Sequence, residues 1–263
     1  MNNRKRARVI VILMIVTAAL LVGIFLLQGK YQKHETIREA MRDAVLHEDN
    51  RIAFFGLEVN PALISGFVVT GIVLLFALIL RIFVIPRFKV KPGKFQILIE
   101  EWVGFFSNLG KTNSPHRNKF LGAYIFAAGS YVFIGTCFEL FGVQAVTTEG
   151  HSVTLPAPLA DINGAIMMGC LSYLVILSGG IAGNGMKGVG KTLKDFSLPI
   201  SMSFRLFGAL LSGMLVTELV YYYISLSFVL PVVVGVLFTL LHALIQTYVL
   251  TMLTSVFYGE VAE

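Results

Sequence analysis

The sequence predicts an all-α integral membrane protein of about six transmembrane helices, with one further amphipathic helix at the membrane interface. Three observations support this fold class. Of the 263 residues, 56% are hydrophobic and 14% are charged, whereas soluble domains contain about 25% charged residues. The apolar residues form runs long enough to cross a hydrocarbon core of about 30 Å. Most of the 21 Lys and Arg residues lie in the segments that flank these runs, as in polytopic membrane proteins.

The first apolar run, Val9–Leu27, follows a basic head within residues 1–8. A cleaved signal peptide is one interpretation, but the run is long for that role and no small-residue cleavage site follows it. We therefore favour a retained anchor helix. The polar, mixed-charge segment Gln28–Asn60 is expected to lie outside the membrane. Residues 1–60 then form an N-terminal anchor with an extracytoplasmic segment, and residues 61–263 form the main membrane domain.

Five further spans are predicted from the remaining apolar runs, and the last two are long enough to cross the bilayer with a strong tilt. Lys and Arg are concentrated in residues 1–8, 86–119 and 182–198. The opposite loops hold five, all in one segment that also carries six acidic residues. The positive-inside rule therefore places both termini in the cytoplasm. The predicted spans are Ala62–Ile85, Phe120–Val143, Ile162–Ile181, Pro199–Ile224 and Pro231–Tyr258.

Between the second and third spans, residues 94–111 show the periodicity of an amphipathic helix. Apolar side chains recur at helical spacing, and Lys and Glu occupy other positions. This pattern is typical of a helix that lies on the cytoplasmic membrane surface, and it fits equally well a helix packed on a partner subunit. The apolar positions are Phe95, Leu98, Ile99, Trp102, Phe106 and Leu109.

Residues 185–192, GMKGVGKT, match the Walker A pattern of nucleotide-binding proteins. A phosphate-binding loop needs a buried strand before it and a helix N-terminus after it. Here an apolar span precedes the glycines and Pro199 follows closely, so we expect no nucleotide binding and predict a short, basic, glycine-rich turn. Nucleic acid is not an expected partner either, because the basic residues flank membrane spans. Cys137 and Cys170 fall inside spans, and we assign them no disulfide, metal or catalytic role.

Arg205 is the only lysine or arginine between Phe196 and Gly259. An arginine at the bilayer centre costs about 2.5–3.5 kcal/mol on insertion, so it marks a functional site by default. Small residues in membrane helices mark close helix approach. A static contact in which Arg205 pairs with an internal carboxylate, Glu139 or Asp161, is the alternative. The small residues at helical spacing from Arg205 are Ser201, Gly208, Ala209, Ser212 and Gly213.

Polar residues of three other spans outline an approach to this helix. Asp161 and Asn163 open the fourth span, and Glu139 lies near the same end of the third. Each could be an ordinary structural polar group, but together they describe a polar route from one face of the membrane, as an aqueous half-channel requires. A polar stripe on the last span comprises Thr239, His242, Gln246 and Thr254.

Three segments, LPISMSFRLFGALLSG, LLHALIQTYVLTMLTSVFYGE and PLADIN, resemble subunit a of the membrane sector of bacterial F-type ATP synthases. The similarity extends over about residues 58–260. It implies a stator subunit whose two half-channels and fixed arginine, Arg205, couple translocation of H⁺ or Na⁺ to rotation of the subunit c ring. It also implies roles for Gln246 on the last helix and for Asp161 and Asn163 at the mouth of the external half-channel. The small residues around Arg205 would face the rotor, and the last two helices would be tilted against the ring.

The resemblance further implies the subunit c ring, the peripheral-stalk subunit b and membrane lipid as partners. The location implied is the bacterial plasma membrane. The subunit would be non-catalytic and without a cofactor, because ATP chemistry would occur on other subunits. A small secondary transporter, with Arg205 binding an anionic substrate, is the alternative function; it would be supported by an internal repeat, and the sequence shows no convincing one.

The sequence departs from the family pattern at Ala209, Met214 and Thr239. The family usually has Asn at the first position, and often Glu or His at the other two. Glu218 and His242 lie one turn beyond the second and third of these positions and on the same helical faces. We hypothesise that these two residues replace the family's usual proton-relay pair.

Overall fold

The computed structural model describes residues 14, 52–54, 57–146, 152–222 and 230–262. Within these residues the chain is almost wholly helical, and two antiparallel hairpins supply the only strands. The hairpins pair β1 (Ile52–Phe54) with β2 (Leu57–Val59), and β3 (Gln144–Val146) with β4 (Ser152–Thr154). The long helices are α3 (Pro61–Ile79), α4 (Lys94–Asn113), α5 (Asn118–Phe138), α6 (Ile162–Lys194), α7 (Ser197–Tyr222) and α8 (Leu230–Ala262).

Five described helices are long and apolar enough to cross a membrane. They coincide with five of the six predicted spans, which confirms the predicted all-α membrane fold. The sixth, Val9–Leu27, lies outside the described residues apart from Met14, as does most of the polar segment that follows it. The five candidate spans are Pro61–Arg87, Asn118–Phe141, Ile162–Lys194, Ser197–Thr217 and Val232–Ala262.

Short turns connect the long helices. After α3 come a π-helical turn, η2 (Leu80–Val84), and a 3-10 turn, η3 (Ile85–Arg87). A 3-10 turn, η4 (Glu139–Phe141), ends α5, and another, η5 (Pro158–Ala160), leads from the second hairpin into α6. The turn η5 contacts α3, α5, α6 and α7. It therefore fixes where α6 begins relative to the other helices.

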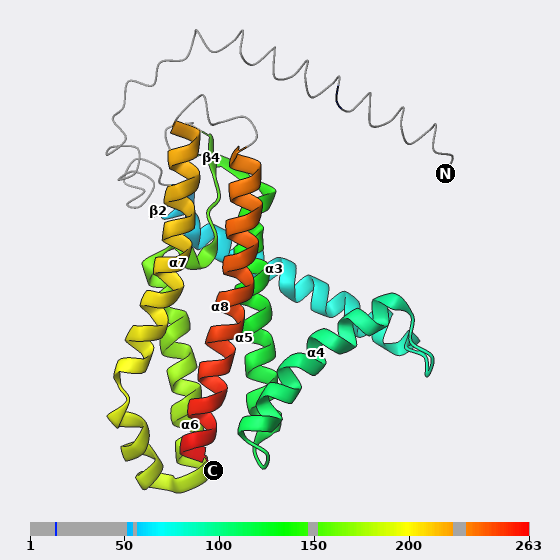
Figure 1. Ribbon diagram of the computed structural model, residues 1–263, viewed down its shortest axis with the longest axis vertical. Helices are drawn as coiled ribbons and strands as arrows, with labels where there is room; N and C mark the ends of the chain where they lie inside the picture. Colours follow the sequence, from blue (N-terminus) through cyan, green and yellow to red (C-terminus); the bar gives the residue numbers. More distant parts are fainter. Residues whose placement is uncertain (1–13, 15–51, 55–56, 147–151, 223–229, 263) are drawn as a thin grey trace.

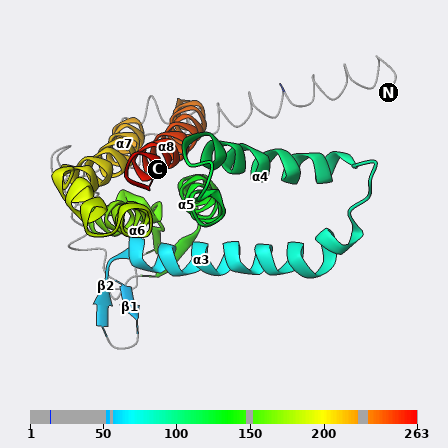
Figure 2. The ribbon, with the colours of Figure 1, turned by 90° about the horizontal axis from the view of Figure 1, so that it is seen from below.

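Helices α5 to α8 form an elongated bundle, from which α3 and α4 extend to one side (Figure 1). Viewed from below, the bundle helices are seen nearly end-on, whereas α3 and α4 are seen lengthwise (Figure 2). The bundle helices and α3 cannot both lie along the normal of a flat bilayer. The bundle, α3 or both must therefore cross the membrane with a tilt. The 33 residues of α8 extend about 50 Å at 1.5 Å per residue, well beyond a hydrocarbon core of about 30 Å. This length favours the bundle as the tilted group.

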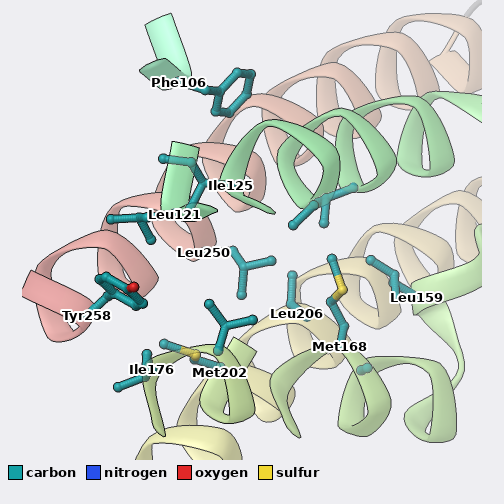
Figure 3. Packing of buried hydrophobic residues seen from close by; sticks show 14 of the residues in the cluster. Phe106, Leu121, Ile125, Leu159, Met168, Ile176, Met202, Leu206, Leu250 and Tyr258 are labelled. Atoms are coloured by element: carbon teal, nitrogen blue, oxygen red, sulfur yellow. The ribbon is translucent and has the colours of Figure 1, made fainter. Parts of the chain in front are cut away.

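The core lies between α5, α6, α7 and α8 and is completed by α4 (Figure 3). Glycines let the backbones approach closely: a Cβ on Gly169 of α6 would lie 2.7 Å from the carbonyl oxygen of Pro199 in α7. Small residues at such contacts are the usual means of helix association in membranes. The largest fully buried apolar side chains of this core are Phe106, Leu121, Ile125, Ile176, Met202 and Leu206.

Helix α4 confirms the predicted amphipathic helix, but the structure adds a partner for its apolar face that neither predicted location includes. Its second half packs within the same chain, against α5 and α8. Phe106 is fully buried, and the Trp102 indole N–H donates a 3.0 Å hydrogen bond to the Ser130 hydroxyl. The first half remains exposed, with Phe95 and Leu98 on the surface. The sequence pattern identifies the apolar face but not the surface that covers it.

The structure confines the predicted basic, glycine-rich turn of residues 185–192 to Gly185. These residues are mostly helical, because α6 continues to Lys194 and α7 begins at Ser197. The chain reverses at Gly185, whose φ of 57° and ψ of −135° are conformations that favour glycine. The short helix after Gly185 folds back on α6, where the Tyr173 hydroxyl donates a 3.0 Å hydrogen bond to the Thr192 carbonyl. A single glycine therefore makes the turn.

Candidate functional site

Arg205 lies on the outer face of α7, near the middle of the candidate span Ser197–Thr217. Its neighbours at helical spacing, Ser201, Gly208 and Ser212, are exposed as well. The opposite face of α7 is buried in the core through Met202, Leu206 and Leu210. The helix thus has a packed inner face and an outer face on which one guanidinium and a row of small residues lie beside the exposed apolar side chains of Ile200 and Phe204. A Cβ on Gly208 would have no heavy atom within 4 Å.

The other two small residues, Ala209 and Gly213, are half-buried. A Cβ on Gly213 would lie 3.8 Å from Nδ1 of His242. His242 Nδ1 is 2.7 Å from the Phe238 carbonyl oxygen, and its ring is stacked on Phe238 at a centroid distance of 5.9 Å. The row of small residues on α7 therefore extends from its exposed face to Gly213, which lies against His242 of α8.

The contact between Gly213 and His242 sets the register of α7 against α8. The two helices run in opposite directions (Figure 1), so one turn back along α7 corresponds to one turn forward along α8. Gln246 then lies level with Ala209, about one helical turn from Arg205. Gln246 is buried, with 5% of its surface exposed. Gln246 is thus buried within the bundle, at a level close to that of Arg205, rather than on the outer surface.

The rest of the polar stripe on α8 differs along its length. Thr239 is half-buried. Thr254 is fully buried, and its hydroxyl donates a 2.8 Å hydrogen bond to the Leu250 carbonyl of its own helix. Thr254 is thus an ordinary structural polar residue, whereas His242 lies against α7, the helix that carries Arg205.

Asp161 is the N-cap of α6. One carboxylate oxygen, Oδ2, accepts hydrogen bonds from the backbone N–H groups of Asn163 at 3.0 Å and Gly164 at 3.4 Å. The other, Oδ1, accepts a 3.0 Å hydrogen bond from the side-chain amide of Asn60. The side chain of Asn163 is exposed. Sequence reasoning missed Asn60, although an asparagine directly before a proline is a signal of a helix N-cap.

The structure gives less detail on the other two acidic residues predicted at the site, Glu139 and Glu218. Glu139 is half-buried and begins η4, a turn that contacts α8. Glu218 belongs to α7, but its side chain lies outside the described part of the structure. Among the described residues, no acidic side chain forms an ion pair with Arg205, and Asp161 has other partners. The alternative in which Arg205 pairs with Glu139 or Asp161 therefore finds no support.

Comparison with known proteins identifies one family. Residues 65–259 match the family model described as ATP synthase A chain. The chain is 28% identical over 183 residues to ATP synthase subunit a of Cereibacter sphaeroides, covering 65% of this chain and 70% of that protein. It is 24% identical over 237 residues to a protein of Propionigenium modestum named as ATP synthase subunit a, sodium ion specific. That match covers 83% of this chain and 80% of the relative.

The family match covers well over half of the chain and includes α7 and α8 with all their described site residues. The five apolar helices agree with a multi-pass protein, and the bacterial relatives agree with the plasma membrane. Subunit a acts in the complex that also contains the c ring and the b subunits. The chain belongs to the ATP synthase A chain family and is a membrane-sector stator subunit that takes part in ion translocation.

Proposed function

We propose that the chain couples the movement of H⁺ or Na⁺ to rotation of the c ring by holding Arg205 against the ring between two aqueous half-channels. The observation that carries this proposal is the position of Arg205 on the exposed face of α7, in line with small residues one and two turns away that leave room for a neighbouring helix. A charge on an otherwise apolar membrane surface is costly. This cost is explained if a group outside the chain, such as a carboxylate of the ring, faces the charge of Arg205.

The chemistry of such a pair explains the coupling. A ring carboxylate that turns into lipid must first be neutralised by a proton or a bound ion, because a bare charge is unfavourable there. Opposite Arg205 the positive charge favours the ionised carboxylate and therefore the release of its ion. Arginine suits this role because it keeps its proton under all physiological conditions. The fixed charge also hinders ions from passing directly between the half-channels.

The proposed external half-channel begins at Asp161 and Asn163 and leads past the α7–α8 contact to Arg205. Gly169 of α6 lies against Ser203 of α7, where a Cβ on the glycine would contact the Ser203 side chain. Because α6 and α7 run in opposite directions, helical rise brings Asp161 to about the level of His242, on the same side of Arg205. The turn η5, directly before Asp161, contacts α7. Glu139 would line the same route from the end of α5.

The proposed orientation places both termini in the cytoplasm and the start of α6 on the outside. The short helix after Gly185 carries Lys187, Lys191 and Lys194, and this arrangement agrees with the positive-inside rule. The end of α8 lies beside the residues just before Gly185, since the Asn184 amide donates a 2.9 Å hydrogen bond to the Val261 carbonyl. We further propose that α7 and α8 are the tilted group, so that a long stretch of α7 lies along the ring.

Gly208→Leu is expected to reduce ATP-driven ion pumping by about tenfold or more, because a bulky side chain beside Arg205 would hold the ring away from the guanidinium. Insertion should be normal, since a Cβ at this position meets no atom of the chain within 4 Å. Gly71→Leu in α3 is the matched control, because a Cβ there is equally unobstructed. Pumping is measured in inverted vesicles that contain equal amounts of the complex. Equal pumping by the two variants would contradict a rotor-facing position for Gly208. The tenfold figure corresponds to about 1.4 kcal/mol in the rate-limiting barrier.

Glu218→Gln and His242→Ala are expected to slow ATP-driven pumping, separately and strongly, if these residues relay the ion in place of the family's usual pair. The position of His242 beside Gly213 supports the hypothesis for the histidine. Loss of a proton relay costs about 10²–10⁴-fold in comparable proton-transfer steps. Thr254→Val, which removes a buried hydroxyl from the same helix, serves as the control. Unchanged pumping in both relay variants would show that the relay runs elsewhere.

Co-purification tests the proposed function as a whole. The full-length chain should be isolated together with a ring of small hairpin subunits and a soluble ATPase. Isolation of a chain that transports an anionic substrate without such a ring would support the secondary-transporter alternative instead.

A further inference from the structure

Asn60 and Asp161 each cap a membrane helix, and a hydrogen bond between their side chains joins the starts of the two helices. The Asn60 side-chain oxygen accepts a 2.9 Å hydrogen bond from the Ala62 backbone N–H and so caps α3. Its amide nitrogen donates the 3.0 Å hydrogen bond to Oδ1 of Asp161, which itself caps α6. The two residues are 101 positions apart in the sequence. Each side chain therefore performs a local capping role and also makes a contact that is long-range in the sequence.

The pair leaves the Asp161 carboxylate little freedom to rotate. Its Oδ2 is held by two backbone N–H groups of α6, at Asn163 and Gly164. Its Oδ1 is held by Asn60, the only described side chain that donates to it. The amide orientation of Asn60 is itself fixed, because its oxygen must face an N–H donor and its nitrogen must face a carboxylate. Hydrogen bonds to a charged group are among the stronger ones in proteins.

We propose that Asn60 is a positioning residue for ion entry, which holds the Asp161 carboxylate at the mouth of the external half-channel and ties that mouth to α3. This inference rests on the proposed function, because it takes Asp161 to lie on the path of the ion. Helix α3 is otherwise mostly exposed, and its other contacts with the bundle are made with η5, α5 and α6. The Asn60 amide is therefore a direct link between α3 and the acidic group.

The pair permits an isosteric exchange that separates capping from positioning. In Asn60→Asp, the new carboxylate still caps α3, since aspartate and asparagine are equally good N-caps. It can no longer donate to Asp161, and two carboxylates then face each other. In the double variant Asn60→Asp/Asp161→Asn, both caps are still present, and the amide of residue 161 can donate to the carboxylate of residue 60. The pair is restored with the acidic group moved from α6 to α3.

The experiment measures ATP-driven pumping and passive ion conduction through the membrane sector, in vesicles normalised to the amount of the chain. We expect Asn60→Asp to lower both rates by about tenfold, the scale of a lost hydrogen bond to a charged group. We expect Asp161→Asn to lower them as well. The exchanged double variant should conduct faster than either single variant, because the second change restores the pair. If Asn60 only capped α3, the second substitution would not raise the conduction rate in this way.

Two results would overturn the inference. One is Asn60→Asp conducting within about twofold of the unchanged protein, since that is less than a lost hydrogen bond to a charge predicts. The other is a double variant whose loss equals the product of the two single losses, as for independent sites. If Asn60→Asp does not accumulate in the membrane, Asn60→Ser replaces it. Serine keeps the cap but is too short to reach Asp161, so normal conduction in Asn60→Ser overturns the inference too.

The proposed function can fail separately. If Asp161→Asn alone leaves both rates unchanged, then the path of the ion does not include Asp161, and the proposed half-channel mouth is wrong together with the inference. If Asp161→Asn is impaired while Asn60→Asp behaves normally, the half-channel stands and only the role of Asn60 is rejected.

Discussion

Arg205→Ala is expected to abolish ATP-driven ion pumping and ion-driven ATP synthesis, while the subunit still inserts and assembles. The guanidinium is exposed on α7 and forms no ion pair with a described acidic side chain, so its removal deprives none of the described carboxylates of a partner. Burial of the opposite face, through Met202, Leu206 and Leu210, is unchanged. The loss should therefore be one of coupling and not of stability. Each charge moved across 100 mV contributes about 2.3 kcal/mol, which is available for rotation only when direct leakage is prevented.

Pumping and ATP synthesis are measured in vesicles, alongside ATP hydrolysis and the amount of assembled complex. Ser201→Ala is the matched control, because Ser201 is exposed on the same face one turn away and carries no charge. Arg205→Lys adds a test of the chemistry: a lysine in a poorly solvated site can lose its proton, so partial leakage of ions is expected rather than full function. Coupled pumping in Arg205→Ala would refute the assignment of Arg205 as the stator charge.

The main features of the fold follow from hydrophobic pattern alone. Runs of apolar residues specify membrane helices because a bilayer leaves few other ways to satisfy the backbone, and five such runs became helices as predicted. A turn within residues 185–192 was predicted, but its confinement to Gly185 was not, because a positive φ at one glycine leaves no trace in a hydropathy pattern. The packing of α4 was missed for a related reason. Its periodicity shows that one side is apolar, but lipid, a partner and the chain's own bundle are all suitable surfaces for it.

In the candidate site, too, local features could be predicted from the sequence, whereas contacts between helices could not. Arg205 with its small neighbours could be identified from the sequence, because spacing on one helix is a local property. Its exposure agrees with the predicted face, while Gly213 proved to lie against His242, a contact that depends on the register of two helices. Asn60 was missed entirely. Its cap on α3 is a local signal, but its bond to Asp161 bridges 101 residues, and no periodicity links positions so far apart.

Gly169→Val is expected to prevent stable assembly of the subunit. A Cβ at Gly169 would lie 2.7 Å from the Pro199 carbonyl oxygen and would also collide with the Ser203 side chain. A valine adds two further methyl groups at this point, and the backbone of α7 must move to make room. Overpacking of this kind commonly costs about 1–3 kcal/mol, and more where the obstructing atom belongs to the backbone. The contact involves Pro199 and Ser203, which precede Arg205 on α7, so a surviving protein would hold the arginine in a different place.

The amount of the chain in the membrane and the thermal stability of the isolated complex provide the measurements. Gly71→Val in α3 is the matched control, since it makes the same chemical change in a membrane helix where a Cβ would meet nothing within 4 Å. Replacing a helical glycine normally stabilises a helix by a few tenths of a kcal/mol to about 1 kcal/mol, so the control should be neutral or slightly stabilising. The changes in stability caused by the two substitutions should therefore differ in sign as well as in size. If Gly169→Val accumulated and resisted heat as well as Gly71→Val, the close contact between α6 and α7 could not be what positions the helix that carries Arg205.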